Sequence, residues 1–169
     1  MKSARGMTLI EVLVALVILG IGVLGIAKLT LFSVRSNDSA YLHTQATALA
    51  YSVLDAMRSN RGAALTAAYD TALATAAANP GFNCAALATP CTPGNLALYD
   101  VYMWKTRLDA ALPGGALPSG AGSVVTATVN NRVTATITVQ WDDIVAQTTF
   151  NKTAAGAAAP VQIVLETVL

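Results

Sequence analysis

The residue that fits its sequence surroundings least well is Glu11, the single charged side chain between residues 7 and 27 (MTLIEVLVALVILGIGVLGIA). A carboxylate inside hydrocarbon costs roughly 2.5–3.5 kcal/mol on insertion scales. Some other group therefore has to offset the cost of placing this charge in an apolar segment. Glu11 is the first candidate for a functional residue.

Cys84 and Cys91 are the two cysteines of the chain and lie in the run CAALATPC. In an oxidising compartment, a disulfide between them is the expected state. Closing so short a loop stabilises a fold by roughly 2.5 kcal/mol in the chain-entropy model. A redox or metal role is the weaker alternative, because the spacing matches no familiar motif and no histidine is near.

The remaining candidates for chemistry are few. His43 is the one histidine, and its place among polar helix positions favours an exposed side chain over a ligand role. Asp142 and Asp143 favour a turn over a calcium site. With 10 Lys and Arg against 9 Asp and Glu, and no basic run, no nucleic-acid partner is expected. We predict no catalytic residue, no metal, no cofactor and no enzymatic activity.

The apolar segment at residues 7–27 is long enough, as a helix of about 31 Å, to cross the hydrocarbon core of a bilayer. Lys2 and Arg5 precede it, and this basic start predicts a cytoplasmic N-terminus with the rest of the chain on the outer side, the periplasm in a bacterium. A cleaved secretory signal is one alternative, but no small-residue cleavage site follows before Lys28. A plain membrane anchor is the other, and it leaves Glu11 unexplained.

The run GMTLIEV, which begins at Gly6, closely resembles the processing motif of type IV prepilins, together with the basic leader and the apolar helix around it. The resemblance implies that a prepilin peptidase removes residues 1–6 by cutting between Gly6 and Met7, and then methylates the new amine of Met7. It also implies that Glu11, with Thr8 beside it, docks the subunit onto its neighbours, because Glu11 pairs with the N-terminal amine of another subunit. Such a buried pair fixes the register between subunits more than it adds net stability.

Helical patterning continues beyond the apolar segment, and we expect one helix from Met7 to about Arg58. Residues 7–28 form its transmembrane or fibre-core part, and residues 29–61 its amphipathic half. The apolar stripe of this half comprises Leu42, Ala46, Leu49, Val53 and Met57, widened by Ala50 and Leu54. The apolar part also contains Gly20, Gly22 and Gly25. These glycines fit either close helix packing in the membrane or a segment that unwinds.

Residues 62–122 are expected to connect the long helix to a sheet. They comprise a short helix at residues 63–78, a loop at 80–96 that holds both cysteines, and a helix at 97–112. The apolar side of this last helix is predicted to consist of Leu98, Val101, Trp104, Leu108 and Leu112.

Residues 123–169 alternate between apolar and polar side chains, which is typical of strands. We expect four antiparallel strands, near residues 125–129, 133–141, 144–150 and 161–168. The first two are joined by a turn at Asn130-Asn131. Their apolar positions are Val125, Ala127 and Val129 on the first strand and Val133, Ala135, Ile137, Val139 and Trp141 on the second. The predicted fold class is α+β and type IV pilin-like, with a long N-terminal helix packed on a C-terminal antiparallel sheet.

Three later segments resemble minor pilins of type IV pili: residues 50–61 (AYSVLDAMRSNR), the helix at 104–112 that ends in LPGG, and the strand at 133–141 that ends in TVQWDD. The resemblance implies a minor pilin that helps to prime pilus assembly and surface display, with roles in adhesion and twitching motility. The implied partners are other minor pilins, the major pilin, the prepilin peptidase and the inner-membrane assembly platform. The implied location is the inner membrane, with a periplasmic head, and then the pilus, at or near its tip.

Two other classes of protein remain open. A minor pseudopilin of a type II secretion system has the same N-terminal motif and the same mechanics. An enzyme tethered by its N-terminal helix is the third possibility, and it lacks a recognisable nucleophile and base in this sequence.

Overall fold

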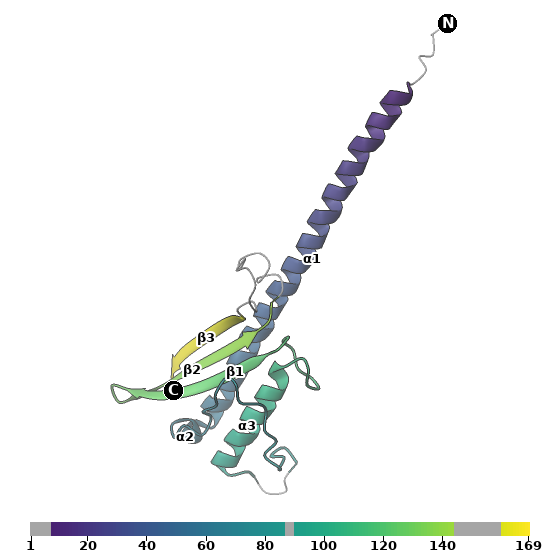
Figure 1. Ribbon diagram of the computed structural model, residues 1–169. Helices are drawn as coiled ribbons and strands as arrows, with labels where there is room; N and C mark the ends of the chain where they lie inside the picture. Colours follow the sequence, from purple (N-terminus) through teal and green to yellow (C-terminus); the bar gives the residue numbers. More distant parts are fainter. Residues whose placement is uncertain (1–7, 87–89, 144–159) are drawn as a thin grey trace. The chain divides into compact units, whose positions relative to one another are not determined.

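A computed structural model describes residues 8–86, 90–143 and 160–169 of the chain, and its longest element is the helix α1, Leu9–Ser59 (Figure 1). The helix ends within one residue of the predicted end, and its expected start at Met7 lies outside the described residues. Over residues 9–34 its large hydrophobic side chains are 44% to 79% exposed. By length and composition, α1 is the one helix of the described residues that is able to cross a membrane.

The chain divides into two compact units, one up to Asp38 and one from Ser39 to Leu169. In the second unit, the last five turns of α1 bury one stripe of side chains. Its fully buried members are Ala46, Ala50, Val53, Leu54 and Met57, and Leu42 and Leu49 are partly buried beside them. This is the predicted amphipathic stripe, and the prediction is confirmed.

The prediction of a short helix at residues 63–78 is wrong. The structure has only α2, Arg61–Ala64, after which the backbone turns through a positive φ of 61° at Ala67. Thr71 then pairs with Val124 through two backbone hydrogen bonds, of 2.9 and 3.0 Å. Alanine favours a helix only weakly in the absence of an apolar stripe to bury, so the pairing with a sheet edge determines the conformation of this segment.

Helix α3, Pro93–Leu108, begins and ends four residues earlier than predicted. Its N-cap is Thr92, whose hydroxyl accepts a hydrogen bond from the backbone N–H of Asn95 (3.3 Å). Proline at the first helical position needs no hydrogen bond for its nitrogen and has a helical φ already. The Pro93-Gly94 pair, predicted as part of a loop at 80–96, is therefore a helix start.

The buried side of α3 agrees with the prediction at Trp104 and Leu108 and differs elsewhere. Leu98 is 54% exposed and Leu112 lies beyond the helix, 37% exposed. The buried residues are Ala97, Trp104, Lys105 and Leu108. Trp104 donates a hydrogen bond from Nε1 to the Leu49 carbonyl of α1 (2.9 Å), which sets the rotation of α3 about its axis.

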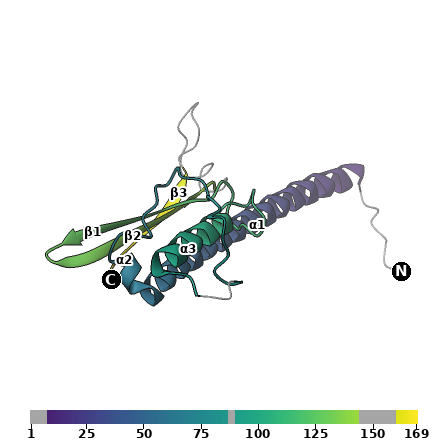
Figure 2. The same cartoon turned by 90° about the horizontal axis from the view of Figure 1, so that it is seen from below.

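Three antiparallel strands form one sheet in the order β1-β2-β3, with β1 at Ala121–Val129, β2 at Arg132–Trp141 and β3 at Val161–Val168 (Figures 1 and 2). The turn between β1 and β2 is at Asn130 and Asn131, with φ of 50° and 60°, as predicted. The strand expected at residues 144–150 lies outside the described residues.

The two faces of the sheet are as predicted on β2 and inverted on β1. Ala135, Ile137, Val139 and Trp141 are fully buried on β2. On β1, Val124 is the buried valine, whereas Val125 and Val129 are about half exposed. The pairing of Val124 with Ile137 explains this, because a shift by one residue moves every side chain of a strand to the opposite face.

The core of the second unit joins the buried stripe of α1, the inner side of α3 and one face of the sheet. Both views place α3 and the sheet beside the C-terminal part of α1 (Figures 1 and 2). The fold is α+β, with a long N-terminal helix packed on a three-stranded antiparallel sheet.

Candidate functional site

Thr8 is the first residue of the N-terminal motif that the structure describes, and Gly6 and Met7 lie outside the described residues. The Thr8 carbonyl accepts hydrogen bonds from the backbone N–H groups of Glu11 (3.1 Å) and Val12 (3.4 Å), which begin α1. Glu11 lies in the first turn of this helix. A negative charge is stabilising there, because the unpaired N–H groups of the helix end carry a partial positive charge. Thr8 and Glu11 are thus brought together by the first turn.

Glu11 is exposed, and apart from Thr8 its neighbours along the helix are apolar. Within residues 8–86, 90–143 and 160–169, the one ion pair is between Arg58 and Asp55 (3.7 Å). Within these ranges, the Glu11 carboxylate therefore has no ion-pair partner.

Cys84 and Cys91 form a disulfide, with their Cα atoms 5.6 Å apart. Cys91 directly precedes Thr92, the N-cap of α3. The bond therefore ties the segment that contains Cys84 to the start of this helix, far along the chain from Glu11.

His43 and Asp143 lie at the contact between α1 and the end of β2. His43 is exposed, and its ring meets the edge of Trp141 at 4.8 Å between centroids, with 89° between planes. Asp143 is 1% exposed and accepts a hydrogen bond from the Ser39 hydroxyl. A turn was predicted at Asp142 and Asp143, and the burial of Asp143 was not predicted. Within the described part of the chain, no group of three or more His, Cys, Asp or Glu residues is placed to bind a metal.

A polar cluster of Asn60, Tyr69 and Asp100 lies inside the second unit. The Tyr69 hydroxyl donates to the Asp100 carboxylate (2.7 Å) and accepts from Asn60 Nδ2 (3.2 Å), which also donates to the Pro93 carbonyl (2.7 Å). Burial raises the pKa of the Asp100 carboxyl, although the hydrogen bond from Tyr69 lowers it in part. Burial also raises the pKa of Tyr69, and its hydrogen bond to Asp100 adds to this shift.

The Asp100 carboxylate predicts a measurable pH dependence. At pH values between the ordinary carboxyl pKa of about 3.9 and the raised pKa of Asp100 in the folded chain, the folded chain binds more protons than the unfolded chain. The free energy of unfolding that Asp100 contributes therefore falls as pH rises through this window. Asp100→Asn keeps an acceptor for Tyr69 and removes the titration, so its stability relative to the parent protein is expected to rise from acidic to neutral pH.

Thermal unfolding of both proteins across this pH range measures the difference. Asp55→Asn, which removes an exposed carboxylate, is the matched control and is expected to change less with pH. A difference for Asp100→Asn that stays constant or falls with pH contradicts the assigned direction.

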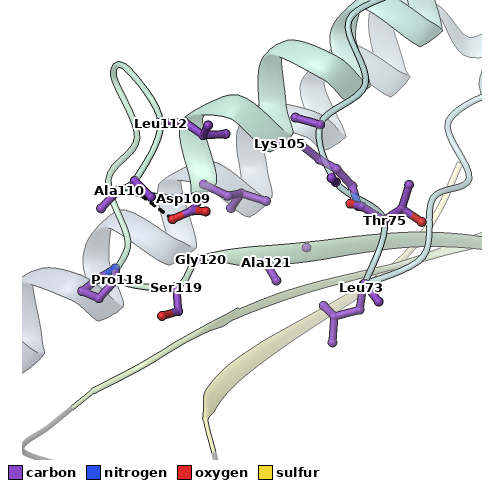
Figure 3. A pocket seen from close by; sticks show the side chains of 16 residues that line it. Leu73, Thr75, Lys105, Asp109, Ala110, Leu112, Pro118, Ser119, Gly120 and Ala121 are labelled. Carbon is purple, nitrogen blue, oxygen red and sulfur yellow. Dashed lines mark hydrogen bonds between the residues drawn. The ribbon is translucent and has the colours of Figure 1, made fainter.

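Lys105 is buried at the edge of a hollow of about 700 Å³ (Figure 3). Its Nζ donates to the carbonyls of Ala72 (2.7 Å) and Thr75 (2.5 Å), and Figure 3 shows the side chain reaching Thr75. Burial lowers the pKa of this ammonium group. Because its hydrogen atoms are directed to carbonyl groups, Lys105 holds the segment at 72–75 against α3 and is not presented as a nucleophile.

Sequence reasoning missed the half-buried Asp100 and the buried Lys105. A stripe drawn from Ala97 at helical spacing passes Asp100, Trp104 and Leu108, with Lys105 next to it, and this spacing was the available signal. The predicted stripe began one residue later, at Leu98, and included neither charged residue.

Together, these features define the class of protein. The chain has an exposed apolar N-terminal helix and a disulfide-bonded α+β head, and this arrangement is a type IV pilin-like fold. A family comparison finds the prokaryotic N-terminal methylation motif over residues 1–27. This motif is typical of type IV pilins and pseudopilins, and together with the exposed apolar helix it supports a membrane-anchored protein of that kind. No curated protein and no solved structure matches the chain.

Proposed function

We propose that the protein is a minor pilin of the type IV pilus, similar to PilV, that helps to prime pilus assembly and surface display. The observation that carries the proposal is the methylation motif joined to a helix whose large apolar side chains over residues 9–34 are all exposed. Exposed apolar surface of this extent requires lipid or other apolar helices around it. The three segments with minor-pilin resemblance, at 50–61, 104–112 and 133–141, support the narrower assignment.

The proposed mechanism starts with processing. The prepilin peptidase cuts between Gly6 and Met7 and methylates the amine of Met7, and the cut removes the positive charges of Lys2 and Arg5. The new amine is a cation at the start of an apolar helix. Pairing of Glu11 with such an amine on a neighbouring subunit satisfies both charges in a helix bundle and sets the axial register.

We also propose that the head lies in the periplasm before the subunit enters the pilus. The basic leader favours a cytoplasmic N-terminus, which places residues after the membrane segment on the opposite side. The Cys84–Cys91 disulfide supports this side, because disulfides persist in oxidising compartments. Its partners on this proposal are other minor pilins, the major pilin and the inner-membrane assembly platform.

Recovery of the major pilin in sheared surface fractions tests the proposal. A strain that lacks this protein is expected to lose most of its surface pilin and to regain it when the gene is returned. Unchanged surface pilin, with altered secreted proteins in the culture supernatant, contradicts the pilus role and supports the minor pseudopilin of a type II secretion system, whose motif is the same.

A further inference from the structure

The outer side of α3 and the segment before the disulfide form an open groove of about 560 Å³. Its walls carry three aromatic rings, because Tyr99 and Tyr102 lie one turn apart on α3 and Phe82 comes from the preceding segment. All three rings are half-buried. The groove is completed by Met103 and by Asn79, Gly81 and Asn83.

The two asparagines of the groove are fixed by their own backbone. Asn79 Oδ1 accepts from the Gly81 N–H and Asn83 Oδ1 accepts from the Ala85 N–H, each at 2.9 Å. Their Nδ2 groups make no hydrogen bond within the described ranges of the chain. Each asparagine therefore has two free N–H donors, while its oxygen already accepts one hydrogen bond.

The groove is also held rigid on both sides. Gly81 has a φ of 79°, a conformation that glycine adopts at little cost, and it turns the segment that carries Phe82. Cys84 lies two residues after Phe82 and is bonded to Cys91 beside the start of α3. A site whose walls are fixed before binding loses less entropy when a ligand enters.

The lining contains no charged side chain, and this decides the class of ligand. Three classes of ligand fit this lining poorly. An anion has no positive side chain to pair with, and a cation is repelled by the amide N–H donors. A wholly apolar ligand leaves those donors without a hydrogen bond. A sugar ring combines an apolar C–H face, which stacks on an aromatic ring, with hydroxyl oxygens that accept from amide groups. We propose that this groove binds a neutral saccharide.

This proposal goes beyond the assembly role and does not depend on it. The test uses the full chain in a polyoxyethylene detergent, since detergents with sugar headgroups would compete. Saturation-transfer NMR with cellotriose and triacetylchitotriose is expected to detect contact of the sugar ring protons with the protein. Sorbitol, which has hydroxyls without a ring, is the negative control.

Variants connect binding to the groove. Tyr102→Ala and Tyr99→Ala are expected to raise the Kd for the saccharide by about tenfold or more, and Tyr99→Phe to retain binding. Tyr51→Ala is the matched control, because Tyr51 is a half-exposed tyrosine of α1 outside the groove. Fluorescence of the buried Trp104 and Trp141 verifies that each variant is folded.

Two results overturn the proposal. The first is a parent protein that gives no saturation transfer to either saccharide. The second is an equal loss of binding in Tyr51→Ala and in the groove variants, which would make the contact unspecific.

Opening of the disulfide with a reductant is expected to weaken binding while the tryptophan fluorescence stays native.

Discussion

A chain with Gly6→Ala is expected to keep its leader and to accumulate in the membrane at the mass of the unprocessed protein. Glycine leaves the backbone before the proposed cleavage point open to close approach, and a Cβ at this position blocks such an approach in the peptidase. The retained residues 1–6 keep Lys2 and Arg5 in front of the apolar helix. The uncleaved chain is therefore expected to be absent from sheared fibre fractions.

Mass spectrometry of the membrane-purified chain measures this result directly. Gly20→Ala is the matched control, because it makes the same substitution inside α1, where an added Cβ meets no atom within 4 Å. We expect this control to be processed as the parent protein is. Complete removal of the leader from Gly6→Ala would contradict the proposed cleavage site.

The elements that the sequence predicted well are those in which one local rule acts without competition. Helix α1 has uninterrupted apolar or amphipathic periodicity over Leu9–Ser59, and the Asn130-Asn131 pair fits the left-handed turn that its hairpin requires. The inward face of β2 follows from strict alternation up to Trp141. In each case the local preference and the tertiary packing agree.

The elements that were mispredicted are those in which a distant contact decides. The alanine-rich segment after α2 lacks a stripe to bury, so the pairing of Thr71 with Val124 determines its path. Val124 makes this pairing from β1, which is an edge strand of the sheet. The register between β1 and β2 then turns Val125 outward. Neither contact is encoded within a window of neighbouring residues.

The proposed functional residues show the same division. Gly6, Met7, Thr8 and Glu11 lie within six residues of one another, and the family comparison matches a motif over residues 1–27 that contains them. The proposed groove is different, because Phe82 and Tyr102 come from separate segments on either side of the Cys84–Cys91 disulfide. A site assembled across such a loop becomes visible only when the fold brings its parts together.

Replacing Gly120 with alanine is expected to destabilise the head by about 3 kcal/mol or more and to lower its Tm by about 10 °C. An added Cβ lies 2.1 Å from the Leu108 carbonyl oxygen and 2.9 Å from the Cβ of Leu117. The Leu108 carbonyl already accepts the Leu117 N–H (2.9 Å), and Leu117 is fully buried. The obstacle is backbone, so no side-chain rotation relieves it.

Two further glycines make this prediction specific. At Gly122 the added Cβ meets ring and methyl atoms of Trp104 and Leu108, at 2.4 and 2.5 Å, which are buried side chains with more freedom to shift than backbone atoms. At Gly62, in α2, it meets nothing within 4 Å, and alanine favours a helix by about 1 kcal/mol over glycine. Unfolding followed by tryptophan fluorescence is therefore expected to rank Gly120→Ala below Gly122→Ala, and both below Gly62→Ala. A Gly120→Ala variant as stable as Gly62→Ala would show that the end of α3 and the start of β1 do not approach as closely as the structure places them.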